Sequence, residues 1–539
     1  MTEQRHGTCN QASEWGYSSG KRYEDPFNEI ELDVLFTDPQ GVECRVPAFW
    51  AGLQEWRVRF APRLTGTYNY RTVCTDETNE DLHGQKGTLE VAPYAGENPL
   101  LSHGPLRVSE DKRFLEHMDG TPFFWLRDTW WMALCKRLAW PEEFQALTAD
   151  RKEKGFSVVQ LVAGPYPDMP AFDPRNENEA GHPWEPEWRR VNPAYYDQAD
   201  RRIQLLVRSE LVPCILGCWG YYVLLMGVEK MKKHFRNLIA RYGAYPIVWC
   251  LAGEAAMPYY LTETRKEDVA KQKKDWTEIA RYVRETDPYH HPITIHPTQV
   301  GRDQVEAPSV LDFDMLQTGH EGRDSIPNTQ QLMRAAVARE PRMPVINGEV
   351  CYEGIFEDSW ANIQRFMFWS CMLSGACGHT YGANGIWQVN AKATLYGPSP
   401  WGGVWGNRLW EDAAQLPGAA HLGVGRQILQ CFEWWRFEPH SDWIEPSADD
   451  NAGWRQPYAA GIPGRVRVFY LPKAYPGYNK KGRPRVQVLE DGYVYKASYV
   501  DPKDAEEYPI GQITGDAQGN WEIPPTPICQ DWLLVLERE

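Results

Sequence analysis

The clearest indication of the fold is the stretch Ile247-Val-Trp-Cys-Leu-Ala-Gly-Glu254, together with its counterpart Pro344-Val-Ile-Asn-Gly-Glu349. Each is a short apolar run, typical of a strand that is buried on both faces, and each ends on a glycine followed by a glutamate. The glutamates are 95 residues apart. That separation equals three strand–helix units of roughly 31 residues each in an unadorned (β/α)₈ barrel. The two stretches therefore predict strands four and seven of such a barrel.

Six further apolar runs complete a set of eight. They begin near Phe123, Ser157, Val212, Pro292, Phe313 and Ala376. Amphipathic stretches between the runs predict helices at Lys230–Tyr242, Glu267–Glu285, Thr329–Arg339 and Trp360–Leu373. Strands that alternate with helices over residues 99–430 predict a central (β/α)₈ TIM barrel. The longest interval contains the loop Pro165–Asp197, which we expect to cover the catalytic face.

The two ends of the chain have a different pattern. In residues 1–98 the runs Ile30–Phe36 and Trp56–Phe60 alternate apolar and polar residues, which predicts an N-terminal antiparallel β-sandwich. In residues 431–539 short β runs, such as Arg465–Leu471 and Trp532–Leu536, predict a small C-terminal β-sandwich. Turn signals at Pro476-Gly477 and in the stretch 515–519 divide these runs.

Composition narrows the class of protein. The chain has 539 residues, a formal net charge of −16 and no block rich in Lys and Arg, so nucleic acid and anionic membrane are not expected partners. No run of 18 apolar residues is present. The N-terminus is polar and the 12 cysteines are scattered, so we expect a cytoplasmic protein, with a removed leader as the alternative. Barrels flanked by sandwiches can also form homo-oligomers.

The paired glutamates suggest a reaction. Glu254 and Glu349 are expected to face each other across the mouth of the barrel, because catalytic groups lie at the C-terminal ends of barrel strands. Two carboxyl groups that flank one bond are what glycoside hydrolysis needs, one protonated and one ionised. The structural alternative is that each glutamate caps a helix or forms an ion pair. Glu353 is a rival nucleophile, although it lies beyond the strand end.

Other residues near the strand ends are candidate contacts to a carbohydrate substrate. They are Asp128, Trp130, Gln160, Trp219, His296, Gln317, His320, Tyr352, His379, Tyr381 and Trp387. Among them Tyr381 could orient a carboxylate and Trp387 could stack on a sugar ring, although a purely structural loop is the alternative for both. Asp128 could equally cap the helix that follows it. Eight of the 24 tryptophans lie at or just beyond strand ends: Trp125, Trp130, Trp131, Trp219, Trp249, Trp387, Trp401 and Trp405.

Competing chemistries have weaker signals. The string Gly16-Tyr-Ser-Ser-Gly20 matches a nucleophile elbow, but it lies in a polar segment without the strand and helix that the elbow needs. His290, His291 and His296 lack the spacing of a metal site. We therefore expect neither a metal nor a cofactor.

The chain resembles the apiosidase-like glycoside hydrolase family, a (β/α)₈ barrel group related to the large clan of retaining glycosidases. The matching stretches of the barrel are Pro122–Trp130, Gly155–Gln160, Arg241–Trp249, Gly253–Glu254, Asn347–Glu353 and His379–Gly382. The N-terminal part resembles the β-sandwich that often precedes this barrel, in the stretches Asp25–Phe27, Arg45–Trp50 and Trp56–Pro62.

The resemblance implies that Glu254 is the acid/base and that Glu349 is the nucleophile of a retaining glycosidase that acts on a plant or microbial glycoside. Two departures concern the sugar: Gly253 stands where the large clan generally has Asn, and Glu254 stands where apiosidase-like members often have Asp. An inverting glycosidase with the same two residues and a non-catalytic carbohydrate-binding protein are the alternatives. A polysaccharide lyase is disfavoured by the scarcity of Lys at the strand ends.

Overall fold

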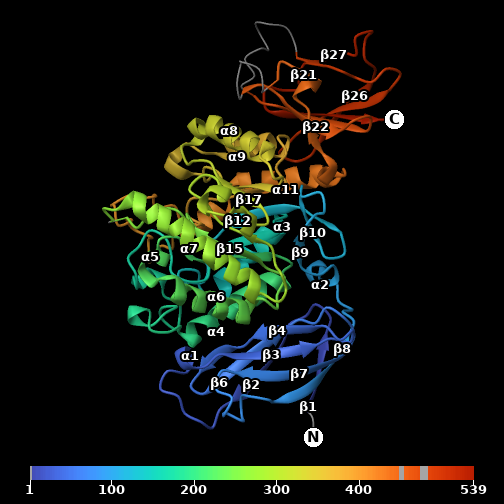
Figure 1. Cartoon of the computed structure of the whole chain (residues 1–539). Coiled ribbons are helices and arrows are strands. Elements are labelled where there is room, and N and C mark those ends of the chain that lie inside the picture. The colour runs from blue at the N-terminus through green and yellow to red at the C-terminus, as the bar shows by residue number, and fades with distance from the viewer. Residues whose placement is uncertain (1–2, 261, 448–454, 474–483) are drawn as a thin grey trace.

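The computed structural model describes residues 3–260, 262–447, 455–473 and 484–539. The chain forms three stacked parts, shown in Figure 1. Blue N-terminal sheets lie at one end, a barrel surrounded by helices lies in the middle, and red C-terminal sheets lie at the other end. The N- and C-termini are therefore at opposite ends of the molecule.

The barrel is built from eight parallel strands in the order β16-β15-β14-β13-β12-β19-β18-β17. They are β12 (Trp125–Thr129), β13 (Val158–Val162), β14 (Val212–Trp219), β15 (Val248–Gly253), β16 (Ile293–Thr294), β17 (Asp314–Gln317), β18 (Val345–Glu349) and β19 (Gly378–Tyr381). The edge strands β16 and β17 are linked by a hydrogen bond from the Asp312 N–H to the Ile293 carbonyl (2.8 Å), so the barrel is nearly closed. The predicted barrel is confirmed, and each strand begins within two residues of a predicted run.

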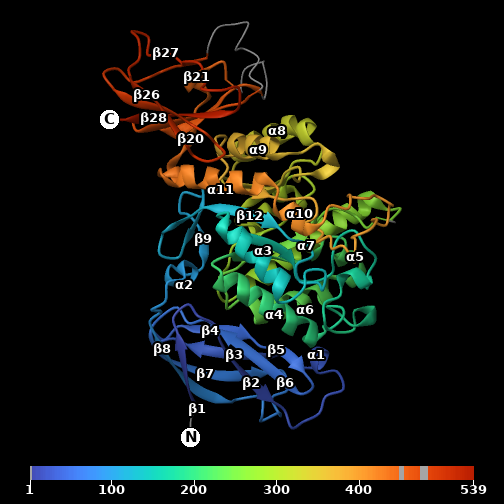
Figure 2. The same cartoon turned by 180° about the vertical axis from the view of Figure 1, so that it is seen from behind.

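Helices surround this barrel and cover its strands, as Figure 2 shows from behind. They are α3 (Glu142–Glu153), α4 (Pro193–Arg208), α5 (Tyr222–Met226), α6 (Val228–Tyr242), α7 (Arg265–Thr286), α8 (Ser325–Ala338), α9 (Ala361–Met372), α10 (Trp410–Ala414) and α11 (Pro417–Gln430). The four helices expected from amphipathic stretches correspond to α6, α7, α8 and α9 within four residues at each end. Their apolar positions face the strands, which is why the periodicity located them.

The N-terminal part consists of two sheets, as predicted for a sandwich. One has the order β1-β8-β7-β3-β4 and the other β2-β6-β5. The strands are β1 (Glu3–Thr8), β2 (Ser13–Ser18), β3 (Leu32–Thr37), β4 (Glu43–Pro47), β5 (Phe49–Gly52), β6 (Glu55–Phe60), β7 (Gly66–Cys74) and β8 (Lys86–Ala92), with a short helix α1 (Pro26–Glu29). All their pairings are antiparallel except that of β1 with β8, which is parallel.

A short helix and a small sheet lead from the sandwich into the barrel. They are α2 (Pro99–Ser102), β9 (Leu106–Val108), β10 (Leu115–His117) and β11 (Pro122–Phe123). The C-terminal part has a six-stranded sheet, β20-β22-β23-β28-β25-β26, and a three-stranded sheet, β21-β24-β27. These strands are β20 (Glu438–Pro439), β21 (Ile444–Glu445), β22 (Tyr458–Ile462), β23 (Val466–Leu471), β24 (Arg485–Val486), β25 (Tyr495–Val500), β26 (Glu507–Ile513), β27 (Trp521–Glu522) and β28 (Trp532–Arg538). The turn predicted at Pro476-Gly477 lies outside the described residues.

Buried ion pairs attach the flanking parts to the barrel. Arg59 of β6 pairs with Asp200 of α4 and also donates to the carbonyl of Arg241 (2.7 Å). At the other end Arg365 of α9 pairs with Asp531, just before β28, at 2.7 Å. Breaking a buried pair leaves an uncompensated charge, so these contacts hold the parts in one arrangement. In the part of the chain that the structure describes, no helix is both long and apolar enough to span a bilayer.

Candidate active site

The two glutamates of the matching stretches lie at the same end of the barrel. Glu349 is the last residue of β18, and Glu254 follows β15 directly. Gln317 at the end of β17 connects them, because it is the register partner of Glu349 and its Nε2 donates to Glu254 Oε1 (3.0 Å). Trp219 at the end of β14 also donates, from Nε1 to Glu254 Oε2 (3.3 Å).

The glycine before each glutamate makes room for a neighbouring side chain. A Cβ at Gly253 would lie 2.2 Å from the Trp219 ring, and a Cβ at Gly348 would lie 2.1 Å from Met315 Cγ. Only glycine fits such close approaches. Glu254 itself has a φ of +44°, in the left-handed region that non-glycine residues rarely adopt. Backbone strain of this kind persists where the surrounding structure holds it and is concentrated at functional sites.

Glu349 is surrounded by hydrogen-bond donors. The Tyr352 hydroxyl donates to its Oε2 (2.6 Å), and Trp131 Nε1 supports that hydroxyl (3.2 Å). His320 Nε2 lies 2.9 Å from Oε1 and His296 Nε2 lies 3.3 Å from Oε2. The side chain of Glu349 is 5% exposed, so these contacts replace most of its hydration.

The environments shift the pKa values of the two carboxyl groups in opposite directions. Burial, and then the negative charge of Glu349, raise the pKa of Glu254 to about 7. Burial alone would also raise the pKa of Glu349, but its contacts with His296 and His320 hold that pKa well below its ordinary value. Burial disfavours the protonated form of His320, yet Glu349 raises the pKa of that imidazole. Glu254 therefore keeps its proton up to about pH 7, where Glu349 is already ionised, which is the division of roles that acid/base chemistry requires.

Both glutamates open into one cavity of about 120 Å³ at the C-terminal end of the barrel. Its lining consists of Trp131, Pro167, Asp168, Trp219, Glu254, Gln317, His320, Glu349, Tyr352, Ile355, Trp387 and Trp405. Seven of the predicted site residues are therefore in the lining: both glutamates, Trp219, Gln317, His320, Tyr352 and Trp387. Trp131 and Trp405, expected from their place near strand ends, are there too.

The rival nucleophile Glu353 lies elsewhere. Its carboxylate accepts from the Tyr381 hydroxyl (2.6 Å) and from the Gly418 N–H at the start of α11 (3.0 Å). The residue is fully buried, and it is absent from the cavity lining. Tyr381 does orient a carboxylate, as expected, but the carboxylate is that of Glu353 and not that of a cavity residue.

Two other predicted substrate contacts lie on the outer side of the strands. The Asp128 carboxylate pairs with Arg151 of α3 (2.6 Å) and accepts from Trp130 Nε1 (2.7 Å). Asp128 and Trp130 are fully buried between the barrel and its helices, and they are not part of the cavity lining. The neighbouring residue Arg127 points inward instead, and its guanidinium donates to the carbonyl of Gly348.

Further predicted contacts are buried away from the cavity lining. Gln160 lies against Cys250 (3.7 Å), and His379 packs on Phe368 with its ring centroid 5.6 Å away. Burial lowers the pKa of His379 to about 3, so its imidazole is neutral. Neither residue lines the cavity, and neither does His296, which contacts Glu349 and packs against the lining residues Trp131 and Trp219. Two tryptophans expected near the substrate, Trp125 and Trp249, are likewise fully buried.

The sequence reasoning missed Pro167, Asp168 and Ile355. Pro167 and Asp168 belong to the long loop that was expected to cover the catalytic face, and Ile355 follows β18 in a 3₁₀ turn. The position of the loop was a usable signal, because a long connection after a barrel strand lies over the mouth. Which residue of that loop points inward depends on its irregular backbone, which no periodicity describes.

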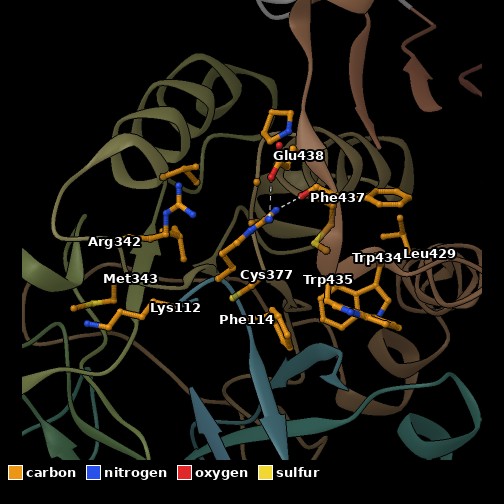
Figure 3. Close-up of a pocket in the computed structure, with 17 residues that line it drawn as sticks. Lys112, Phe114, Arg342, Met343, Cys377, Leu429, Trp434, Trp435, Phe437 and Glu438 are labelled. Carbon is orange, nitrogen blue, oxygen red and sulfur yellow. Dashed lines mark hydrogen bonds and ion pairs between the residues drawn. The ribbon is translucent and has the colours of Figure 1, made fainter. Parts of the chain in front are cut away.

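A second cavity, of about 320 Å³, lies at the opposite end of the barrel against the C-terminal sheets (Figure 3). Glu438 is the only carboxylate among its described lining residues, and Arg113 donates to it (3.1 Å). Phe114, Trp434 and Phe437 form its apolar wall. A single exposed, paired carboxylate cannot supply both an acid and a nucleophile, so this cavity does not qualify as the active site.

Comparisons with known proteins agree with this geometry. The model of a family described as the apiosidase-like catalytic domain matches residues 109–436, and that of a domain of unknown function, DUF5060, matches residues 10–75. No curated protein matches the chain. No group of three or more His, Cys, Asp or Glu side chains in the described ranges is placed to hold a metal ion.

Solved structures share the fold at low sequence identity. One, named a glycoside hydrolase, has a TM-score of 0.63 and 22% identity over 82% of this chain and 98% of its own. A family 5 glycoside hydrolase from Bacteroides vulgatus ATCC 8482 has a TM-score of 0.64 and 22% identity over 82% and 95%. A second protein from that organism covers 99% of this chain and 100% of its own, with 19% identity and a TM-score of 0.69.

The apiosidase-like model spans more than half of the chain, and both glutamates lie within the matched residues. The chain belongs to the apiosidase-like family and is a glycoside hydrolase.

Proposed function

We propose that the protein cleaves a plant or microbial glycoside with retention of anomeric configuration, with Glu254 as the acid/base and Glu349 as the nucleophile. The observation that carries the proposal is the opposite shift of the two pKa values within one cavity. Pairs of titratable groups whose pKa values are pushed apart mark the acid and the base of an active site.

In the first step Glu254 donates its proton to the glycosidic oxygen as the bond to the leaving group breaks. The carboxylate of Glu349 attacks the anomeric carbon and forms a glycosyl-enzyme ester. Tyr352 holds Glu349 Oε2 through its hydrogen bond, which leaves the orientation of the nucleophile fixed before the substrate arrives.

In the second step Glu254 acts as a base and takes a proton from water, which then releases the sugar from Glu349. Glu254 can change from acid to base because its pKa depends on the charge of Glu349. The negative charge of Glu349 helps to raise the pKa of Glu254, and that charge is absent while Glu349 is esterified. The pKa of Glu254 therefore falls in the intermediate, which makes it ready to accept a proton.

Inversion requires Glu349 to act as a general base toward water. A general base works best when its pKa is near the working pH, whereas that of Glu349 is held far below neutrality. A carboxylate that stays ionised is always available to attack carbon, and its low pKa makes it a good leaving group in the second step. The same paired, accessible carboxyl groups argue against a purely sugar-binding protein, because binding alone needs no protonated partner beside an ionised one.

The test is a panel of 4-nitrophenyl glycosides and plant oligosaccharides, with the products followed by chromatography. For the best substrate, ¹H NMR of the first product formed reports the anomeric configuration. We expect the configuration of the substrate to be retained. An inverted first product would contradict the nucleophilic role of Glu349.

A further inference from the structure

A third carboxyl group in the active-site cavity has no role in the two-carboxylate mechanism. Asp168 lies in the loop between β13 and α4 and lines the cavity together with Glu254 and Glu349. The charge of Asp168 contributes to the raised pKa of Glu254. The pKa of Asp168 is itself raised by burial and, to a smaller degree, by the charge of Glu349. Carboxyl groups that share a site raise one another's pKa values, and the two-carboxylate mechanism does not need the third.

Neutral donors from two other loops hold Asp168. The Tyr260 hydroxyl donates to Oδ1, and Trp405 Nε1 donates to Oδ2 (3.1 Å). The Asp168 N–H also reaches the Tyr260 oxygen (3.1 Å). Asp168 has a φ of +54°, so its backbone too is in the left-handed region. In the described part of the chain no cation pairs directly with this carboxylate, although the charge of Arg175 favours its ionised form.

The carboxylate keeps capacity for more hydrogen bonds. An ionised carboxylate offers about four acceptor positions on its two oxygens, of which Tyr260 and Trp405 occupy one on each oxygen. One further position on each oxygen is left, and the residue borders the cavity. Two acceptor positions about one carboxylate suit a pair of hydroxyl groups on one sugar ring.

The rest of the cavity narrows the class of ligand. None of its described lining residues is Lys or Arg, while three are acidic, so a uronic acid would meet unfavourable charge. The walls include the rings of Trp219, Trp387 and Trp405, which can cover the apolar faces of a sugar. A volume of about 120 Å³ is close to that of a cavity of roughly 150 Å³ that holds a single benzene ring. The space therefore suits one ring.

We propose that Asp168 determines substrate specificity by accepting two hydroxyl groups of a single neutral, terminal sugar, the unit whose glycosidic bond is cleaved. The inference rests on the proposed function and adds the substrate class: a neutral sugar removed from the end of a chain or from an aglycone. Asp168 is a binding residue, and the proton and the nucleophile still come from Glu254 and Glu349.

The experiment combines one substitution in the protein with the removal of one hydroxyl group from the substrate. Wild type and Asp168→Asn are compared on the 4-nitrophenyl glycoside that wild type cleaves fastest and on the analogues of that glycoside that lack one hydroxyl each. Asp168→Asn should lower kcat/KM on the parent by about 10- to 100-fold, as expected for the loss of hydrogen bonds to a charged acceptor. On the analogue that lacks a contacted hydroxyl, the variant and wild type should differ by less than about threefold, since the interaction is already absent.

Asp173→Asn is the matched control. Asp173 lies in the same loop, its carboxylate is also held by hydrogen bonds (from Arg175, 2.8 and 2.9 Å), and it does not line the cavity. Asp173→Asn should change kcat/KM by the same factor on every substrate. The same uniform pattern in Asp168→Asn would overturn the specificity role, because a loosened loop affects every substrate equally.

Two additions keep the inference testable in every case. If Asp168→Asn does not fold, Tyr260→Phe, which removes a donor to Asp168 from outside the cavity lining, should show the same substrate pattern with a smaller effect. Binding of free monosaccharides, followed by tryptophan fluorescence, needs no catalysis. If wild type cleaves no glycoside, the proposed function fails, yet tighter sugar binding by wild type than by Asp168→Asn would still support Asp168. Equal binding, or no binding to wild type, would overturn it.

Discussion

Glu349 and Glu353 are four residues apart, both are buried, and each accepts a hydrogen bond of 2.6 Å from a tyrosine. Their surroundings differ. The other neighbours of Glu349 are two histidines and a cavity, whereas the other partner of Glu353 is the Gly418 N–H at the start of α11. The pKa of Glu349 is accordingly lowered, while burial raises the pKa of Glu353. Burial and a tyrosine partner thus do not distinguish a catalytic carboxylate from a structural one, but contacts with histidines and access to a cavity do.

The largest loss of activity is expected when Glu349 is replaced. Glu349→Ala should lower kcat by at least about 10³-fold on the best aryl glycoside, as the loss of a nucleophile does in other covalent mechanisms. Its thermal stability should fall by less than that of Glu353→Ala, because Tyr352 and His320, which lose their acceptor, line the cavity and can bind water there. Steady-state kinetics and a melting curve on the same sample measure both quantities. Wild-type kcat in the folded variant would contradict the assignment.

The acid is tested by its pH dependence. Wild-type kcat/KM should fall above about pH 7, because the pKa of Glu254 is raised to about 7 and only its protonated form donates. Glu254→Gln should lose this basic limb and retain more activity on substrates with a good leaving group, which need little protonation. Because the fold raises the pKa of Glu254, the stability that is present while Glu254 is protonated is lost as this residue ionises. The melting temperature of Glu254→Gln relative to wild type should therefore increase from pH 5 to pH 8.

Glu353→Ala should lose stability and keep its activity, whereas Glu349→Ala should lose its activity. Removing the carboxylate leaves the Tyr381 hydroxyl and the Gly418 N–H without their acceptor, at a cost of about 1–3 kcal/mol for each buried group. Denaturant unfolding should show this loss, while kcat per folded molecule stays within about threefold of wild type. A Glu353→Ala variant that is stable but inactive would contradict the structural role of Glu353 and make it the catalytic residue.

The smallest effect is expected at the second cavity. Glu438→Gln removes the carboxylate of an exposed ion pair with Arg113, and such pairs contribute about 0–1 kcal/mol to stability. Kinetic constants should stay within about twofold of wild type, and the unfolding midpoint should barely move. A large loss of activity would mean that this end of the barrel takes part in the reaction.

The positions of the eight strands and of both glutamates could be predicted because the pattern of short apolar runs and helices is local. Arg127 and Asp128 show where that reasoning ends. In a strand buried on both faces the apolar pattern does not reveal which residue points inward, and here Arg127 does while Asp128 faces the helices. The same ambiguity affected Tyr381. Asp168 and Trp405 meet through loops 237 residues apart in sequence, a contact that depends on tertiary packing alone.

The boundaries expected near residues 98 and 430 stay predictions, as do the oligomeric state and the cellular location. The sequence did predict antiparallel sheets on both sides of the barrel. It did not predict the parallel pairing of β1 with β8, because β1 pairs with the last strand of the sandwich and not with a sequence neighbour. Long-range pairing of this kind has no local signature.

The central claim is that Glu349 forms a covalent bond to the sugar. The direct measurement is mass spectrometry of the enzyme after incubation with the 2-deoxy-2-fluoro derivative of its best substrate, since the fluorine slows release of the intermediate. We expect one sugar per chain. Peptide mapping after proteolysis should place this sugar on Glu349. Attachment at Glu353, or no attachment together with an inverted product, would contradict the account.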